Sequence, residues 1–226
     1  MLNQTETILG PEPPPSAYLE AYRVLRSSVM ALREREPFQT VLLTSPGERE
    51  GKTTIAINLG VVLGLVQQKT ILADADFYGS GVSNALDISA DARGLTDICL
   101  GDVELDDALL PTELDSLLVL PAGTRSDQGP ELVATGVMEE AIDQLKQRAS
   151  YVLFDCTPLS GFGTAVSLAP LVDTVFLVSL ARSQVMDVRR CLDELEQVGA
   201  RVGGVVVNDV LPRDSVVYRA YHRYYQ

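Results

Sequence analysis

A loop that ends in Gly51-Lys52-Thr53-Thr54 lies between an apolar stretch and a stretch with the pattern of a helix. Such a loop can bind phosphate, because its backbone N–H groups and the first helical turn stabilise an anion, the lysine reaches the outer phosphates and the next hydroxyl binds Mg²⁺. The strict pattern has glycine at position 46, where this chain has Pro46, which lacks an N–H. The loop alone is therefore compatible with a phosphate site and equally with a helix cap that carries a chance lysine. The expected nucleotide-binding residues are Gly47, Glu48, Arg49, Glu50, Gly51, Lys52, Thr53 and Thr54.

Acidic residues follow two other apolar stretches. Asp74 and Asp76 come at the end of one expected strand, and Asp155 comes at the end of another. The carboxyl ends of neighbouring parallel strands meet where an open α/β sheet binds its ligand. Three acids at that edge need a cation, and Mg²⁺ bound to nucleotide phosphates is the natural partner. One or two of these acids could instead cap the segments that follow them. Together with the loop, they favour a nucleotide site with Mg²⁺.

The elements expected to position these residues alternate along the chain. Continuous runs of Val, Ile, Leu and Phe are typical of strands that are covered on both faces. Alternation of such strands with helices predicts a mostly parallel central sheet with helices on both faces, in a single α/β domain. The expected strands are Thr40–Thr44, Thr70–Ala73, Leu117–Leu120, Tyr151–Phe154, Thr174–Val178 and Val202–Val207, and the expected helices between them are Lys52–Val66, Leu132–Arg148 and Gln184–Val198.

Composition excludes several classes of function. The 226 residues include 18 lysines and arginines against 31 aspartates and glutamates, a net charge of -13, which disfavours binding to nucleic acid. Three scattered cysteines argue against a disulfide framework or a cysteine zinc site. Because His222 is the single histidine, histidine metal sites and Ser-His-Asp triads are excluded. No signal peptide or membrane span is evident, so we expect a cytoplasmic protein with no membrane insertion of its own.

The two ends of the chain differ from the expected domain over residues 16–211. Residues 1–15 are rich in proline and predict a flexible N-terminus. The helix expected after Ser16 has Leu19 and Met30 on its charged side, which favours an interface over a solvated face. Residues 212–226 could dock on the core, but the basic residues between the aromatic ones favour a flexible, modifiable tail. This tail contains Tyr218, Tyr221, Tyr224 and Tyr225.

With these motifs, the sequence resembles the bacterial tyrosine kinases of the capsular and exopolysaccharide type, a branch of the P-loop ATPases related to MinD and ParA. The loop with Lys52 resembles their Walker A motif, residues 74–76 resemble Walker A′, and residues 152–155 resemble Walker B. Residues 20–26 fit the E-x-x-R-x-x-R oligomerisation motif of the family. The last residues resemble its C-terminal tyrosine cluster. The resemblance covers nearly the whole chain after residue 15 and implies the P-loop NTPase fold.

The resemblance also implies a role for each residue of the motifs. Lys52 would neutralise charge on the β- and γ-phosphates of ATP, and Asp74 would be the base that takes the proton of the tyrosine hydroxyl. Asn208 matches a position that contacts the adenine in related ATPases. The Mg²⁺ ligands, direct or through water, would be Thr53, Asp76 and Asp155; the oligomer interface would include Glu20, Arg23 and Arg26; and the phosphorylated residues would be Tyr218, Tyr221, Tyr224 and Tyr225.

The implied function is that of an autokinase which uses ATP and Mg²⁺ to phosphorylate tail tyrosines between subunits of a ring-like homo-oligomer, and which regulates capsular or exopolysaccharide synthesis or export. A membrane protein of the chain-length-regulator type would activate it and recruit it to the inner face of the cell membrane. Two other functions remain open. One is a MinD/ParA-like ATPase, although the signature lysine of that group is Gly47 here. The other is a nucleotide-binding pseudo-kinase scaffold, because Arg49 replaces a usual glycine and arginines are missing after Asp76.

Overall fold

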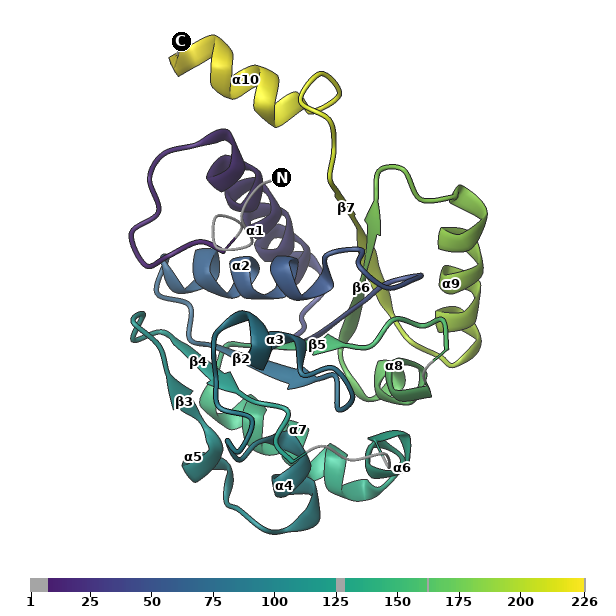
Figure 1. The fold of residues 1–226 in the computed structure, drawn as a ribbon. Helices are drawn as coiled ribbons and strands as arrows, with labels where there is room; N and C mark the ends of the chain where they lie inside the picture. The colour runs from purple at the N-terminus through teal and green to yellow at the C-terminus, as the bar shows by residue number, and fades with distance from the viewer. Residues whose placement is uncertain (1–7, 125–128, 162, 226) are drawn as a thin grey trace.

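The computed structural model describes residues 8–124, 129–161 and 163–225. Among these residues, seven strands form one sheet in the order β3-β4-β2-β5-β1-β6-β7 (Figure 1). All neighbouring strands pair in parallel except β3, which is antiparallel to β4. The strands are β1 (Thr40–Thr44), β2 (Thr70–Ala75), β3 (Leu110–Pro111), β4 (Leu117–Leu120), β5 (Tyr151–Cys156), β6 (Thr174–Leu180) and β7 (Val202–Asn208). The six predicted strands and the mostly parallel α/β sheet are confirmed.

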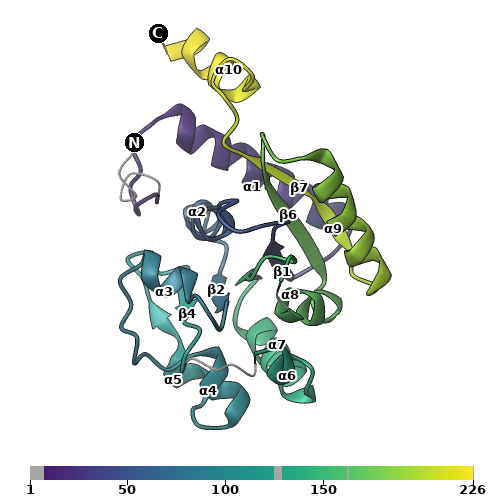
Figure 2. The ribbon, with the colours of Figure 1, turned by 45° about the vertical axis from the view of Figure 1, so that its right-hand side comes forward.

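Helices cover both faces of the sheet. In Figures 1 and 2, α1 and α2 lie on one face, and α7, α8 and α9 lie on the other. Successive side chains of a strand point to opposite faces of the sheet, so each strand contributes to the core on both faces. In β1, Leu42 belongs to one core cluster, and Val41 and Leu43 belong to the other. The helices are α1 (Ala17–Arg35), α2 (Lys52–Gly64), α3 (Gly81–Ala85), α4 (Leu95–Leu100), α5 (Leu105–Ala108), α6 (Gly129–Val133), α7 (Gly136–Arg148), α8 (Gly163–Leu168), the 3₁₀ turn Ala169–Leu171, α9 (Val185–Gln197) and α10 (Val216–Tyr225).

Several boundaries differ from the prediction. β2 continues to Ala75, so Asp74 lies inside the strand and not beyond its end. The helix expected over Leu132–Arg148 is two helices, because α7 begins anew at Gly136 after Thr135. β3 was not predicted, since a two-residue strand leaves no periodic pattern. The short helices α3, α4, α5 and α8 were missed for the same reason.

The N-terminal segment and α1 also differ from expectation. Ile8 and Leu9 pack against the core, and the Leu9 N–H donates to Asn58 Oδ1 on α2 at 2.8 Å, so this part of the segment is not a free linker. Leu19 is fully buried in the same core, and Met30 packs against it. Leu19 and Met30 therefore do not support an interface, because both side chains pack against the core of their own chain.

The C-terminal segment forms a helix where a flexible tail was predicted. Figures 1 and 2 show α10 standing beyond the end of β7, next to α1, and the two helices are in contact. Tyr218 is 38% exposed, and its ring lies 4.1 Å from that of His222. Tyr224 and Tyr225 belong to the last turn of α10, and their side chains lie outside the described residues.

Asp97 on α4 connects that helix to the loop after β4. Its carboxylate is buried and accepts hydrogen bonds from the Gly94 N–H at 2.9 Å, the Thr124 N–H at 3.1 Å and the Thr124 hydroxyl at 2.8 Å. Arg93 adds an ion pair at 2.7 Å. Burial by itself raises the pKa of Asp97, but the hydrogen bonds from Thr124, Arg93 and Gly94 outweigh it and hold the pKa below its ordinary value.

We expect Asp97→Asn to lower the free energy of unfolding by about 2–4 kcal/mol at pH 7, because it removes a buried, hydrogen-bonded charge. The pKa of this acid is lower in the folded than in the unfolded chain, so its stabilisation is present at neutral pH and is lost as the pH falls through the folded pKa. Urea unfolding at several pH values should show the difference from wild type shrinking below about pH 4. The exposed Asp102→Asn is the control. A difference that stays constant with pH would contradict the prediction.

Candidate nucleotide site at the carboxyl edge of the sheet

The loop from β1 into α2 has the backbone shape of a phosphate cradle. Arg49 and Gly51 both have positive φ, at 59° and 89°, and α2 begins directly at Lys52. A Cβ atom at position 51 would lie 2.1 Å from Asn208 Nδ2 at the end of β7, so only glycine fits there. The sequence therefore places the N-terminus of a long helix, with Lys52 in its first turn, at the edge where the parallel strands end.

The predicted acids come together at this edge. Asp74 of β2 and Asp155 of β5 are directly paired in the sheet, and both are buried. Asp74 accepts the backbone N–H groups of Asp76 at 3.1 Å, Val82 at 3.0 Å and Ser83 at 3.3 Å. These bonds fix the Asp74 carboxylate beneath the segment that follows β2.

Thr53 connects the loop to Asp155. Its hydroxyl donates to Asp155 Oδ2 at 2.6 Å, and the charge of Lys52 is close enough to lower the pKa of Asp155. The second oxygen, Asp155 Oδ1, is buried and has no hydrogen-bond partner among the described residues. A buried carboxylate oxygen without a partner is costly, and a cation or a water held by one would satisfy it. This orphaned atom is what makes the residues present fit Mg²⁺.

Burial perturbs both carboxyl groups of the pair. It is the main cause that raises the pKa of Asp74 to about 8, and the negative charge of Asp155 adds to it. Burial likewise raises the pKa of Asp155 to about 7, against the opposing hydrogen bond from Thr53 and the charge of Lys52. Perturbed carboxyl groups at a ligand-binding edge are typical of functional sites.

Asp76 lies near the pair but is engaged locally. Its Oδ1 accepts the N–H of Tyr78 at 3.2 Å and of Gly79 at 2.8 Å, and its charge raises the pKa of Asp74 and Asp155. Among the described residues, no group of three or more His, Cys, Asp or Glu side chains is arranged to hold a metal ion by itself. A cation here would need the Thr53 hydroxyl, water and phosphate oxygens to complete its shell, as Mg²⁺ sites with nucleotides do.

Glu50 was expected to bind nucleotide, but its side chain points toward the end of β6. Its carboxylate is buried and bonded to the loop after β6, while its carbonyl oxygen accepts from Asn208 Nδ2 at 3.0 Å. Asn208 therefore contacts the loop between β1 and α2. By contrast, Glu48 and Arg49 have exposed side chains.

Gly81 is part of the site and was missed by the sequence analysis. A Cβ atom there would lie 2.8 Å from Thr53 Oγ1 and 3.3 Å from Asp155 Oδ2, so the start of α3 touches the expected metal ligands. The signal that could have found it is the pair Gly79 and Gly81 directly after the Asp74–Asp76 segment, because glycine permits a close backbone approach.

Gly81→Ala is expected to weaken binding of Mg-ADP by about tenfold, because the added methyl group overpacks the Thr53–Asp155 contact by an amount typical of 1–3 kcal/mol. Fluorescence titration with a labelled ADP, with Mg²⁺ and with chelator, measures it. Gly136→Ala is the matched control, since no atom lies within 4 Å of its Cβ position. Equal affinity of the Gly81 variant and wild type in Mg²⁺ would show that α3 does not border the site.

The predicted oligomerisation motif lies on α1, away from these contacts. Arg23 forms an exposed ion pair with Glu20 at 3.3 Å, and Arg26 donates to the Val62 carbonyl on α2 at 3.1 Å. Because α1 also contacts α10, the motif and the tyrosine-bearing helix lie side by side.

No helix in the described part of the chain is long and apolar enough to cross a membrane.

The chain is similar to several known proteins. Residues 49–199 match the family described as AAA domain. The tyrosine-protein kinase CpsD of Streptococcus agalactiae is 28% identical over 169 residues, which are 74% of this chain and 74% of that protein. The crystal structure of the chimerical protein CapA2B2 superposes with a TM-score of 0.84 at 25% identity, over 91% of this chain and 90% of that one.

A third relative shows the wider fold. The septum site-determining protein MinD of Pyrococcus horikoshii, complexed with Mg-ADP, has a TM-score of 0.65 at 24% identity, over 82% of this chain and 76% of that one. The seven-stranded sheet and the helices on both of its faces thus belong to a P-loop fold. The chain belongs to the family described as AAA domain, and its relatives include proteins named tyrosine-protein kinase.

Proposed function

We propose that this chain binds ATP with Mg²⁺ at the carboxyl edge of the sheet and transfers the γ-phosphoryl group to tyrosines on α10 of a second copy. The observation that carries the proposal is the buried pair Asp74 and Asp155 beside the Thr53 hydroxyl and the start of α2. Kinship with proteins named tyrosine-protein kinase supports the choice of acceptor. In a cell, the protein would act at the inner face of the membrane, recruited and activated by a membrane protein of the chain-length-regulator type, and would regulate polysaccharide synthesis or export.

Each residue of the site has a place in this proposal. Backbone N–H groups of the loop and the first turn of α2 bind the phosphates, and Lys52 neutralises charge that develops on the transferred group. Thr53, Asp155 and Asp76 would hold Mg²⁺, which supplies positive charge against the phosphate oxygens when bound. Asn208 would contact the adenine.

Asp74 takes the proton of the acceptor hydroxyl. A tyrosine hydroxyl has a pKa of about 10, so it is protonated at pH 7 and needs a base as the new O–P bond forms. The proton moves to the Asp74 carboxylate, and the bond between the γ-phosphorus and its bridging oxygen breaks to leave ADP. Asp74 suits this role because its raised pKa brings its basicity nearer to neutral pH than that of an ordinary carboxylate.

Transfer between subunits fits the position of the tail. α10 lies against α1, which carries Glu20, Arg23 and Arg26, so an oligomer built on α1 would place the tail of one subunit near a neighbour. Phosphorylation adds roughly two negative charges per tyrosine, which on an acidic protein should repel the tail and loosen a ring.

A mixing experiment tests the direction of transfer. A Lys52→Met chain can only accept phosphate, and a chain with Tyr218, Tyr221, Tyr224 and Tyr225 replaced by phenylalanine can only donate it. Each should be silent alone with Mg-ATP, and phosphotyrosine should appear on the Lys52→Met chain when the two are mixed. Labelling of wild type without labelling in the mixture would mean transfer within one chain. Nucleotide binding without any phosphotyrosine in wild type would leave an ATPase or a pseudo-kinase scaffold.

A further inference from the structure

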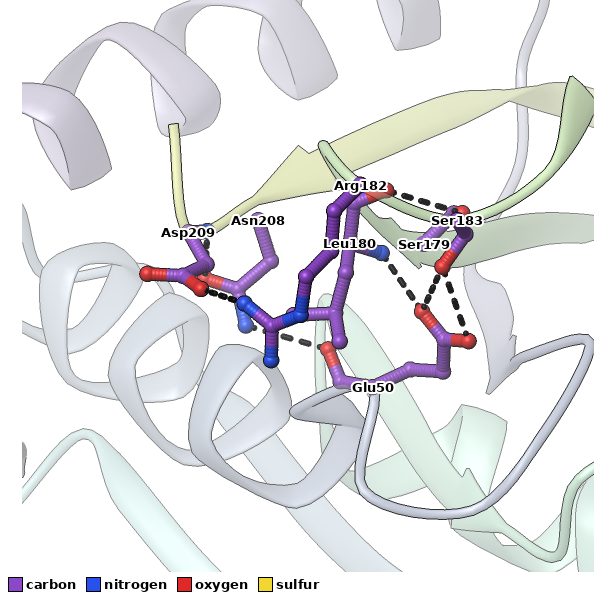
Figure 3. A network of polar contacts seen from close by, with 7 residues as sticks. All are labelled: Glu50, Ser179, Leu180, Arg182, Ser183, Asn208 and Asp209. Carbon is purple, nitrogen blue, oxygen red and sulfur yellow. Dashed lines mark hydrogen bonds and ion pairs between the residues drawn. The ribbon is translucent and has the colours of Figure 1, made fainter. Parts of the chain in front are cut away.

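Glu50, directly before Gly51 and Lys52, has its carboxylate buried away from solvent, with 8% of the residue exposed. Figure 3 shows the carboxylate turned to the loop after β6. Glu50 Oε2 accepts the Leu180 N–H at 2.5 Å and the Ser183 hydroxyl at 2.9 Å, and the same hydroxyl lies 3.1 Å from Oε1. A buried charge with this many donors is anchored, because leaving it without them would cost several kcal/mol.

The backbone of the same residue is held from the other side. Asn208 at the end of β7 donates its Nδ2 to the Glu50 carbonyl oxygen at 3.0 Å, and its Oδ1 accepts the Asp209 N–H at 2.8 Å. Next to the bond between Asn208 and Glu50, an ion pair between Arg182 and Asp209 joins the loop after β6 to the loop after β7 (Figure 3). The nucleotide loop is therefore tied to the ends of two strands through one residue.

We propose that Glu50 is a positioning residue, which pre-organises the nucleotide loop by holding the Glu50–Gly51 peptide between the ends of β6 and β7. The loop needs this support because two of its residues, Arg49 and Gly51, have positive φ. Its N–H groups bind phosphate strongly only when they already point at the place the anion will take. The Glu50 carboxylate itself does not contact phosphate or metal, since its oxygens are directed to Leu180 and Ser183. This inference rests on the nucleotide-binding part of the proposed function.

The test compares Mg-ADP affinity among variants of the full chain by fluorescence titration with a labelled ADP. Glu50→Ala should weaken binding by about tenfold, the amount expected from losing one or two charge-assisted hydrogen bonds that organise the loop. Glu50→Gln keeps a carbonyl oxygen for the Leu180 N–H and should stay within about threefold of wild type. Glu140→Gln, the same change at an exposed glutamate on α7, is the matched control and should have no effect.

Ser183→Ala separates positioning from general loss of structure. It should weaken binding by about threefold in the wild-type chain and have no further effect in the Glu50→Ala chain, because both changes remove the same contact. All titrations are made well below the thermal midpoint of every variant.

Five outcomes are distinguishable. The pattern above supports the proposal. Glu50→Ala with wild-type affinity, additive effects of the two substitutions, or Glu50→Gln as weak as Glu50→Ala would each overturn it. Failure of the wild-type chain to bind Mg-ADP would overturn the proposed function itself, which keeps the two failures distinguishable.

Discussion

Lys52→Met is expected to lower the rate of tyrosine phosphorylation by about 10²–10³-fold, because it removes the positive charge that meets the phosphates at the start of α2. Methionine has nearly the length of lysine, so packing at the first turn of the helix should change little. The site would keep its buried acids and lose the cation that opposes them. Burial raises the pKa of Asp155 to about 7, and the charge of Lys52 opposes this rise.

Time courses of phosphotyrosine by blotting, at saturating Mg-ATP, measure this effect. The matched control is Lys69→Met, since Lys69 is exposed and precedes β2 at the opposite end of the strand from Asp74. The control should phosphorylate like wild type. If Lys52→Met kept its rate within about tenfold of wild type, Lys52 would not hold the transferred group, and the loop would lose its assigned role.

Asp74→Asn is expected to lower the transfer rate by about 10²–10⁴-fold and to leave Mg-ADP binding nearly unchanged, because an amide cannot take the proton of the tyrosine hydroxyl. The side chain keeps its size, but one of its two accepting oxygens becomes an NH₂ group. At least one of the bonds from Asp76, Val82 and Ser83 will therefore be lost. Thermal unfolding must accompany the rate measurement so that loss of fold is separated from loss of the base.

The control for Asp74→Asn is another carboxylate that accepts backbone N–H groups, at the opposite end of the parallel strands. Asp173 accepts the N–H groups of Gln39 and Thr40, each at 2.8 Å, and pairs with Lys146 at 2.9 Å. Asp173→Asn should lower stability without changing the rate of the folded protein. Comparable loss of rate in both variants would mean that Asp74 acts through the fold alone.

The pH dependence of transfer gives a second readout of Asp74. A base must be deprotonated to work, so the rate should rise with pH as this carboxyl loses its proton. Burial raises the pKa of Asp74 to about 8 in the chain without nucleotide, and the positive charge of a bound cation lowers it. The rise should therefore fall between the ordinary carboxyl range and pH 8, and the residual rate of Asp74→Asn should lack it.

The central sheet could be predicted from sequence because it is buried on both faces. Strands such as β1 and β5 are nearly continuous apolar runs. Because these strands alternate with helices along the chain, only a few sheet topologies are compatible with the sequence. The short elements after β2 could not be predicted, since α3, α4 and α5 have six residues or fewer and no resolvable period. Asp97 was missed for a related reason: its four partner atoms belong to the loops before α4 and after β4, and only the fold shows them converging.

For α1, the periodic pattern predicted the helix correctly. It did not predict that Leu19 and Met30 pack against the core of the same chain. Leu19 and Met30 fall among charges in a helical projection, yet both pack on the core because the helix is embedded deeper than its most apolar face suggests. A projection shows which side chains share a face and does not show how far the neighbouring elements reach around it. The case for an interface on α1 now rests on Glu20, Arg23 and Arg26.

By itself, the sequence predicted a phosphate-binding loop before Lys52, acids near the ends of two strands and the family resemblance, because these depend on residue type and on spacing along one strand and one turn. The tertiary structure alone decided how residues far apart in the chain meet. It paired Asp74 with Asp155, bonded Thr53 to that pair, brought Gly81 against them and turned Glu50 toward β6 and β7. Contacts between separate strands depend on register and packing across the sheet, and no local pattern encodes the direction in which a loop side chain finally points.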